Sequence, residues 1–311
     1  MNTIKVAIAQ FSSVHLDLHA SMTRLEEIVM AAKDEDIRLL VFGETWLSGY
    51  PSWLDNCPDV AKWDHDPTKE AYLKLRNSSI EVPGPETHQI GQLAKEAKMN
   101  LVIGVNEVVK NDRASGTVFN GLLTFNDQGQ LVNHHRKLVP TYTEKMIYGH
   151  GDAHGLQAVD TSIGRVGGLV CWEHWMPLTR QALHDTAEDI HVAVWPTVHD
   201  RHQVASRQYA FEGRCFVLAA GQLLQAKDYP AELELPPALA QDTSQLVLQG
   251  GSCIINPRGE YLVEPVFGEE KLVMAEIDLD QRIKEQMTLD TSGHYQRPDV
   301  FELNINKARQ L

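Results

Sequence analysis

Cys171 is the residue of this sequence best placed to act as a nucleophile. It stands between an apolar, strand-like run and a helix-like segment, in residues 167–177 (GGLVCWEHWMP). A thiol at the end of a buried strand can be held partly exposed, and a following helix N-terminus and nearby donors favour its thiolate form. We therefore expect Cys171 to be partly exposed and to carry out covalent chemistry.

Two carboxylates and a lysine occupy positions that could assist such a thiol. Glu44 follows the apolar strand 39–42, where burial would raise its pKa and make it a base near neutral pH, unless it only caps a turn. Lys137 ends another strand, and its ammonium could stabilise a developing anion, although most strand-end lysines are solvated. Glu144 could orient Lys137 or serve as a second carboxylate; the alternative is a weak surface ion pair.

The other cysteines and the histidines give weaker signals. Cys215 and Cys253 lie inside apolar runs and are expected to be structural, whereas Cys57 is expected to line the pocket or lie at the surface. The four cysteines form no Cys-x-x-Cys pair, so we expect no metal site, no disulfide framework and a cytoplasmic protein. A thiol-redox role is disfavoured because Cys171 has no nearby resolving cysteine.

Hydrophobic periodicity predicts a single α/β domain over residues 1–311. Apolar strands alternate with amphipathic helices, and the runs mix fully apolar and alternating patterns, which indicates a mixed sheet pair covered by helices. The segments 48–67 and 222–243 are expected to be long loops. Strands are expected at 4–11, 37–42, 101–105, 165–170, 190–195, 216–220, 251–256, 261–264 and 272–277, two strands within 119–137 joined at 126–129, and helices at 20–33, 87–99, 174–185, 202–214 and 278–286.

Composition excludes several classes of partner. The formal net charge is −14 without a cluster of Lys and Arg, which argues against nucleic acid and against an anionic membrane surface. No apolar run is long enough to span a bilayer, and the first residues lack the pattern of a signal peptide. We expect a partner that is a small molecule.

Glu44, Lys137 and Cys171, in this chain order and each at a strand end, resemble the Glu-Lys-Cys set of the nitrilase superfamily of carbon-nitrogen hydrolases. The resemblance covers almost the whole chain, and the Cys-Trp-Glu-His sequence at 171–174 resembles the nitrilase branch in particular. It also includes residues 6–10 (VAIAQ), 42–46 (FGETW), 49–51 (GYP), 136–138 (RKL), 140–141 (PT) with Glu144, 177–178 (PL), 293–295 (GHY) and 297–298 (RP).

This resemblance implies an αββα sandwich that pairs into a homodimer or a higher homo-oligomer, with no cofactor. Cys171 would attack a nitrile carbon, Glu44 would act as base, Lys137 would stabilise the charged species, and Glu144 would position Lys137 or substrate. The backbone amide of Trp172 would be a further donor. The ring of Trp172 would form a wall of the substrate pocket. Tyr50 and Trp195 would add aromatic surface near the site, although each of these two rings is equally well explained as core.

Two departures from the family pattern limit how far the properties of the family can be transferred to this sequence. The chain ends at Leu311, soon after the Gly-His-Tyr segment, where long members continue, and His150 stands between two glycines where glutamate or glutamine is usual. The sequence predicts a nitrilase that acts on an arylacetonitrile or aliphatic nitrile. The alternatives are an amidase, a cyanide- or nitrile-hydrating member of the superfamily, and a non-catalytic scaffold protein.

Overall fold

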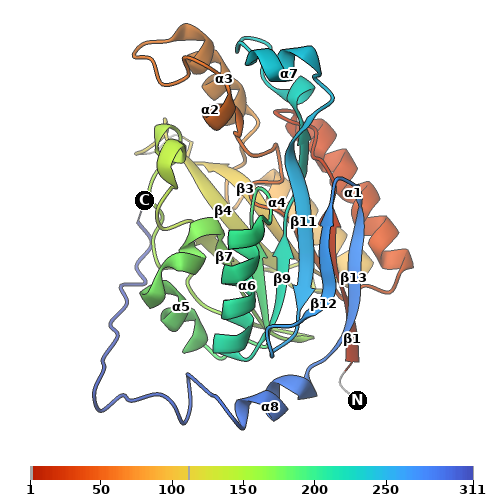
Figure 1. Cartoon of the computed structure of the whole chain (residues 1–311), viewed down its shortest axis with the longest axis vertical. Helices are drawn as coiled ribbons and strands as arrows, with labels where there is room; N and C mark the ends of the chain where they lie inside the picture. Colours follow the sequence, from red (N-terminus) through yellow and green to blue (C-terminus); the bar gives the residue numbers. More distant parts are fainter. Residues whose placement is uncertain (1–2, 111–112, 311) are drawn as a thin grey trace.

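The computed structural model describes residues 3–110 and 113–310. Two β-sheets pack face to face, and helices cover the outer face of each sheet (Figure 1). The expected four-layer αββα sandwich is therefore confirmed.

The first sheet has six strands in the order β13-β1-β2-β3-β4-β5, of which β1, β2 and β3 are mutually parallel. Helices α1 and α4 pack on its outer face through their buried apolar residues. The bounds are β1 Thr3–Gln10, α1 Leu18–Asp34, β2 Leu39–Phe42, α4 Pro85–Ala97, β3 Asn100–Val108, β4 Val118–Phe125, β5 Leu131–Arg136 and β13 Lys271–Asp278.

The second sheet follows the order β10-β11-β9-β8-β7-β6, with β12 paired to β11, and its central strands β7, β8 and β9 are parallel. Helices α5 and α6 pack against it. The bounds are β6 Val159–Thr161, β7 Gly164–Val170, α5 Pro177–His184, β8 Ile190–Val194, α6 Asp200–Gly213, β9 Phe216–Ala220, β10 Leu223–Gln225, β11 Leu246–Ile255 and β12 Tyr261–Phe267, followed after β13 by α8 Asp280–Gln286.

Strand β1 shows why the apolar runs have no clear alternation. Val6 and Ile8 point into the core between the sheets, whereas Ala7 and Ala9 point into the core under α1 and α4. Successive side chains of a strand face opposite sides, so a strand covered on both sides is apolar throughout.

Gly168 on β7 lies close to β4 of the other sheet. A methyl group at Gly168 would lie only 2.8 Å from Leu122 Cδ2 on β4. Gly168 therefore allows close packing of the sheets three residues before Cys171.

The prediction that residues 48–67 and 222–243 are loops without regular structure is wrong in part. The first segment contains α2 (Trp53–Asn56) and the start of α3 (Asp66–Asn77). The second contains β10, the 3-10 turn η3 (Ala226–Asp228) and α7 (Pro237–Gln241). Elements of three to five residues are too short to show a periodic pattern.

The predicted helix 174–185 is divided in the structure. A 3-10 turn, η2 (Cys171–Trp175), comes first, Met176 is extended, and α5 starts at Pro177. The division arises because the proline ring disfavours helical backbone in the preceding residue. Cys171 therefore opens a 3-10 turn and does not stand directly before an α-helix.

The other elements are found close to their expected positions. The predicted turn at 126–129 joins β4 and β5, and a further 3-10 turn, η1 (Tyr142–Met146), follows β5. Among the described residues, no helix combines the length and apolar character needed to cross a bilayer.

Candidate active site

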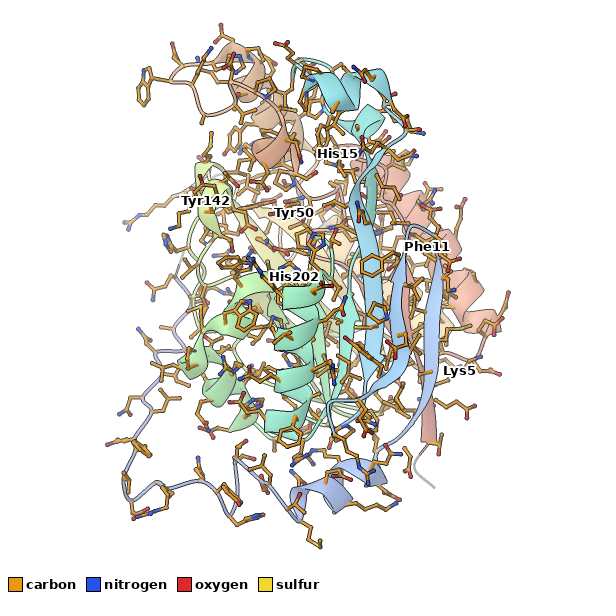
Figure 2. All side chains as sticks on the ribbon, in the orientation of Figure 1. Lys5, Phe11, His15, Tyr50, Tyr142 and His202 are labelled. Carbon is orange, nitrogen blue, oxygen red and sulfur yellow. The ribbon has the colours of Figure 1, made fainter. Side chains whose placement is uncertain are left out.

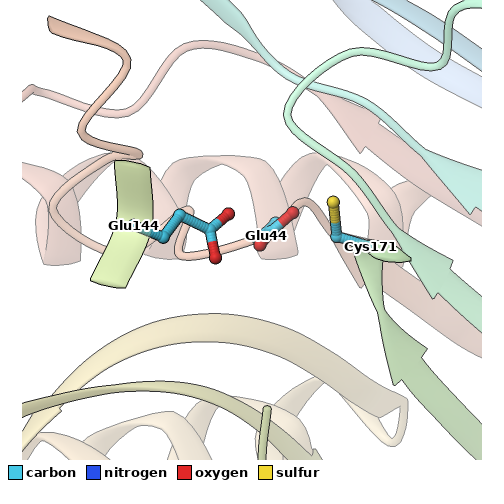
Figure 3. Close-up of side chains that lie close together, drawn as sticks. All are labelled: Glu44, Glu144 and Cys171. Carbon is cyan, nitrogen blue, oxygen red and sulfur yellow. The ribbon is translucent and has the colours of Figure 1, made fainter. Parts of the chain in front are cut away.

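Three predicted catalytic residues from two sheets meet at one place. Glu44 follows β2 and Lys137 follows β5 in the first sheet, whereas Cys171 follows β7 in the second. Figure 3 shows Glu144, on η1, beside Glu44 and Cys171. A carboxylate oxygen of each glutamate and the Cys171 sulfur all lie within 4.8 Å of one another.

Lys137 joins the two carboxylates. Its Nζ lies 2.9 Å from Glu44 Oε1, and 2.9 and 2.7 Å from the two oxygens of Glu144. Burial alone would lower the pKa of Lys137, but Cys171, Glu44 and Glu144 act against it and raise the pKa well above its ordinary value. The ammonium is therefore a fixed positive charge.

The two carboxylate oxygens of Glu44 differ in their hydrogen bonds. Oε1 accepts from Lys137 and from Asn120 Nδ2 at 2.7 Å, whereas the buried Oε2 has no hydrogen-bond partner among the described residues. Burial raises the pKa of Glu44 to about 7, despite the opposing effect of Lys137. This carboxylate therefore has the properties of a general base at neutral pH.

Cys171 is buried, so the expectation of a partly exposed thiol is wrong. Burial, followed by the charge of Glu44, raises the pKa of the thiol well above its ordinary value, and Lys137 and the Trp172 backbone amide only oppose this effect. The expected stabilisation of the thiolate by a helix terminus is overcome by desolvation. This thiol needs a base to become a nucleophile.

The backbone of Cys171 is itself unusual. Its φ is +53°, in the left-handed region that residues other than glycine rarely adopt. Such conformations cluster at functional sites, where the surrounding structure holds them in place.

Glu144 is held by three different groups. Besides Lys137, Tyr50 donates its hydroxyl to Oε1 at 2.8 Å, and the Thr141 backbone amide donates to Oε2 at 2.8 Å. Glu144 therefore connects Lys137 to Tyr50 and to the start of η1.

A cavity of about 400 Å³ opens at Cys171. Trp172 and Tyr50 line it, and Figure 2 marks Tyr50, Tyr142 and His202, which come from separate segments of its wall. Trp195 does not line it: this ring is fully buried and stacks against His202 with centroids 4.3 Å apart. The remaining lining residues are Ser52, Asp55, Asn56, Thr141, Thr143, Glu144, Pro196, Thr197, His199, Val247 and Leu248.

The remaining cysteines are not part of this site. Cys215 and Cys253 are fully buried in the hydrophobic core, as expected. Cys57 is also buried, in an apolar cluster with Trp53 and Leu54, so the expectation of a pocket-lining or surface position is wrong.

Three polar residues that sequence reasoning missed support the site. Asn120 and Gln222 bind Glu44, through its Oε1 and its backbone carbonyl respectively. Glu173 accepts hydrogen bonds from the Leu138 amide at 2.8 Å and the Val170 amide at 2.7 Å. It thus ties the residue after Lys137 to the residue before Cys171. The sequence signal for Asn120 and Gln222 is a polar side chain within or beside an apolar run, whereas Glu173 belongs to the Cys-Trp-Glu-His sequence.

The acidic cluster has a cation of its own. Glu44, Glu144 and Cys171 are grouped closely enough to be considered as metal ligands among the described residues. The Lys137 ammonium, however, contacts both carboxylates at 2.7–2.9 Å and already supplies a positive charge between them. The arrangement fits nucleophilic chemistry with a base and a fixed cation.

Comparison with known proteins identifies the family of this chain. The model of the carbon-nitrogen hydrolase family matches residues 5–284. The chain is 35% identical to "Nitrilase 2" from an unknown prokaryotic organism, covering 99% of this chain and 94% of the relative. It is 34% identical to an arylacetonitrilase of Trametes versicolor, covering 98% of each.

Solved structures show the same fold. A carbon-nitrogen hydrolase from Helicobacter pylori superposes with a TM-score of 0.71 at 18% identity, over 96% of each chain. An amidase from Nesterenkonia sp. gives 0.63 at 16% identity, over 92% of this chain and 94% of that one. With the family match and the relatives, these findings show that the chain belongs to the carbon-nitrogen hydrolase family and is an enzyme of the nitrilase type.

Proposed function

We propose that this enzyme hydrolyses an arylacetonitrile or an aliphatic nitrile to the carboxylic acid and ammonia through covalent intermediates on Cys171. The observation that carries this proposal is the unpartnered Oε2 of Glu44, a buried carboxylate whose pKa burial raises to about 7, beside a thiol that needs a base.

In the first half of the reaction, Glu44 takes the proton of the Cys171 thiol, and the sulfur attacks the nitrile carbon. One carbon–nitrogen π pair moves to nitrogen, which receives the proton, so that a thioimidate forms. Water, activated by Glu44, then adds to the thioimidate carbon. The tetrahedral species expels ammonia and leaves a thioester.

In the second half, another water attacks the thioester with Glu44 again as base. The carbon–sulfur bond breaks, the thiol regains a proton, and the acid leaves. The sum is one nitrile and two waters giving one acid and one ammonia.

Lys137 and the Trp172 backbone amide supply the positive charge and the hydrogen-bond donor for the tetrahedral species. Donors placed in advance where charge develops stabilise the transition state more than the ground state. Glu144 holds Lys137 by two contacts and so acts as a positioning residue.

The walls of the cavity support a nitrile with an aromatic or alkyl group. Trp172 and Tyr50 offer ring surfaces, and Val247 and Leu248 offer apolar contacts, in a volume of about 400 Å³. An arylacetonitrilase is among the relatives. Trp195 would then contribute indirectly, because its ring stacks against His202, which lines the cavity.

The main alternative is an amidase or a nitrile-hydrating activity on the same residues. If the tetrahedral species expels the Cys171 thiolate instead of ammonia, an amide leaves. A bifunctional nitrilase/nitrile hydratase from Oryza sativa is 36% identical to this chain, covering 99% of the chain and 86% of the relative. Cyanide as substrate would release formate or formamide by the same steps.

A substrate panel tests the proposal. Ammonia, acid and amide are quantified for arylacetonitriles, aliphatic nitriles, cyanide and the matching amides, with Cys171→Ala as control. Ammonia and acid from nitriles, lost in Cys171→Ala, are expected. Turnover of amides alone would establish the amidase alternative, and unchanged turnover in Cys171→Ala would overturn the role of the thiol.

The proposal includes a single domain that forms a homodimer or a higher homo-oligomer in the cytoplasm. Helices α5 and α6 expose Leu178, Val204 and Phe211, which supports pairing across these helices. Light scattering after size-exclusion chromatography, on the native protein and on Val204→Glu, measures the association. A monomeric native protein would contradict this part.

A further inference from the structure

A chain of buried polar side chains runs from the backbone of Cys171 into the second sheet. His174 Nδ1 lies 2.7 Å from the Cys171 carbonyl oxygen, and His174 Nε2 lies 2.9 Å from His191 Nε2. His191 Nδ1 lies 2.7 Å from Glu188 Oε1, and Tyr209 donates to Glu188 Oε2. All of these side chains are buried, and none is used by the mechanism above.

The chemistry of each contact fixes the direction of this buried histidine chain. A carbonyl oxygen can only accept, so His174 carries its proton on Nδ1. In a neutral His174 the Nε2 atom is then an acceptor, and His191 must donate to it. The remaining nitrogen of a neutral His191 accepts, so the Glu188 carboxyl must donate.

The environment favours this neutral form. Burial lowers the pKa of His174 and of His191 well below the ordinary value, and burial raises the pKa of Glu188 to about 7. Every donor therefore points the same way: Tyr209 to Glu188, Glu188 to His191, His191 to His174, and His174 to the Cys171 carbonyl. Hydrogen bonds arranged in series polarise and strengthen one another.

The buried histidine chain ends at the peptide unit between Cys171 and Trp172. The carbonyl of Cys171 and the amide of Trp172 belong to the same planar group and point in opposite directions. A donor that holds the carbonyl on the side away from the thiol therefore orients the amide toward the thiol. The Trp172 amide does face the Cys171 sulfur, where it opposes the rise in the pKa of the thiol that burial causes.

We propose that His174, supported in series by His191 and Glu188, positions and polarises the Cys171–Trp172 peptide so that the Trp172 amide becomes a strong donor to the tetrahedral intermediate. This inference rests on the proposed role of that amide. The left-handed backbone of Cys171 is consistent with it, because this conformation needs a partner to hold it. His174, His191 and Glu188 are thus positioning residues that do not touch substrate.

A pair of substitutions at one position separates this role from simple packing. His174→Phe fills the same space without a donor, whereas His174→Asn places an amide nitrogen where Nδ1 stood and can still donate to the Cys171 carbonyl. We expect His174→Phe to lower kcat on the order of 10²-fold with little change in KM, because the donor acts on charge that develops in the transition state. His174→Asn should restore kcat to within about tenfold of the native enzyme.

Binding of an aldehyde provides a readout that requires no turnover. The Cys171 sulfur adds to the aldehyde carbon, the π pair moves to oxygen, and the thiol proton is transferred to that oxygen, which then lies where the Trp172 amide donates. Calorimetric titration with phenylacetaldehyde, with Cys171→Ala as blank, should show a Kd that rises in His174→Phe and largely recovers in His174→Asn.

His184→Phe is the matched control. His184 is also a buried histidine near Glu188, at 3.9 Å, but in the described contacts it does not touch Cys171, and its Nε2 has no partner. Native aldehyde affinity and kcat are expected for this variant. If His174→Phe does not fold, His191→Phe, which removes the donor to His174, is expected to show the same changes to a smaller degree.

The outcomes are distinguishable. Equal kcat and aldehyde affinity in His174→Phe and the native enzyme, or an equally large loss in His174→Asn and His174→Phe, would overturn the inference. A native enzyme that binds the aldehyde through Cys171 but hydrolyses no nitrile would instead overturn the proposed function, and the aldehyde affinities would still test the role of His174.

Discussion

Lys137 Nζ lies 2.9 Å from Glu44 Oε1 and leaves Glu44 Oε2 without a partner. The same carboxylate is thus anchored by one oxygen and available through the other. An anchored base with an open acceptor can receive a proton without moving. This relationship and the pocket around it lead to five predictions.

Glu44→Gln should keep the fold and lower kcat by about 10²–10⁴-fold, because an amide cannot take the thiol proton. Its oxygen can still accept from Lys137 or Asn120. Steady-state kinetics and a thermal melt check the two parts separately. A rate close to the native one would show that the carboxylate is structural.

The pH profile should depend on Glu44. Burial raises its pKa from 4.5 to about 7, and only the deprotonated form can act as base, so kcat/KM should rise with pH through about 7. The profile is measured on the best nitrile of the panel. A flat profile between pH 6 and 8 would contradict the assignment of this base.

Stability should show the opposite trend. A carboxyl whose pKa is raised in the folded state stabilises the fold fully below its ordinary pKa, and this contribution is lost as the pH rises through about 7. Glu44→Gln has no ionisable carboxyl at this position, so its stability does not show this decrease as the pH rises. The difference in Tm, variant minus native, should therefore increase from pH 5 to pH 8, and a constant difference would contradict the raised pKa.

Lys137→Met should abolish activity and destabilise the protein. Removing the ammonium leaves Glu44 and Glu144 close together without a cation, and breaking such a buried set typically costs about 3–5 kcal/mol. Adding Glu144→Gln should recover part of the stability but no activity. Urea unfolding of the single and double variants measures the coupling, and simple additivity would argue against it.

Trp172→Ala and Trp195→Phe should have different effects. Trp172 is 53% exposed and lines the cavity, so loss of its side chain should raise KM for arylacetonitriles more than for small aliphatic nitriles. Trp195 is fully buried behind His202, so Trp195→Phe should lower Tm with little effect on this preference. Equal effects on both nitrile classes in Trp172→Ala would exclude the ring from aryl recognition.

Much of this site could be predicted from the sequence because its members mark strand ends. A predicted strand that ends at a Glu, Lys or Cys is visible along the chain, and the ends of parallel strands gather at one edge of a sheet. The resemblance then placed Glu44, Lys137 and Cys171 together, and the fold confirms the four-layer sandwich.

Other features depend on three-dimensional burial and were not predictable. The sequence around Cys171 suggested a partly exposed thiol, but the two sheets and η2 enclose it, which reverses the expected direction of its pKa shift. The contact between His174 and His191 joins residues seventeen positions apart on different elements. No local sequence pattern predicts such a contact.

The close approach of Gly168 to Leu122 has a consequence for how a substitution could inactivate the enzyme. The base and the ammonium belong to one sheet and the sulfur to the other, so the spacing between sheets also sets the distance between reacting groups. A larger side chain at Gly168 would have to displace the Leu122 side chain or move β7 away from β4, and the second response would move the nucleophile away from its base. Catalysis would then be lost in a protein that remains folded, from a change that touches no reacting atom.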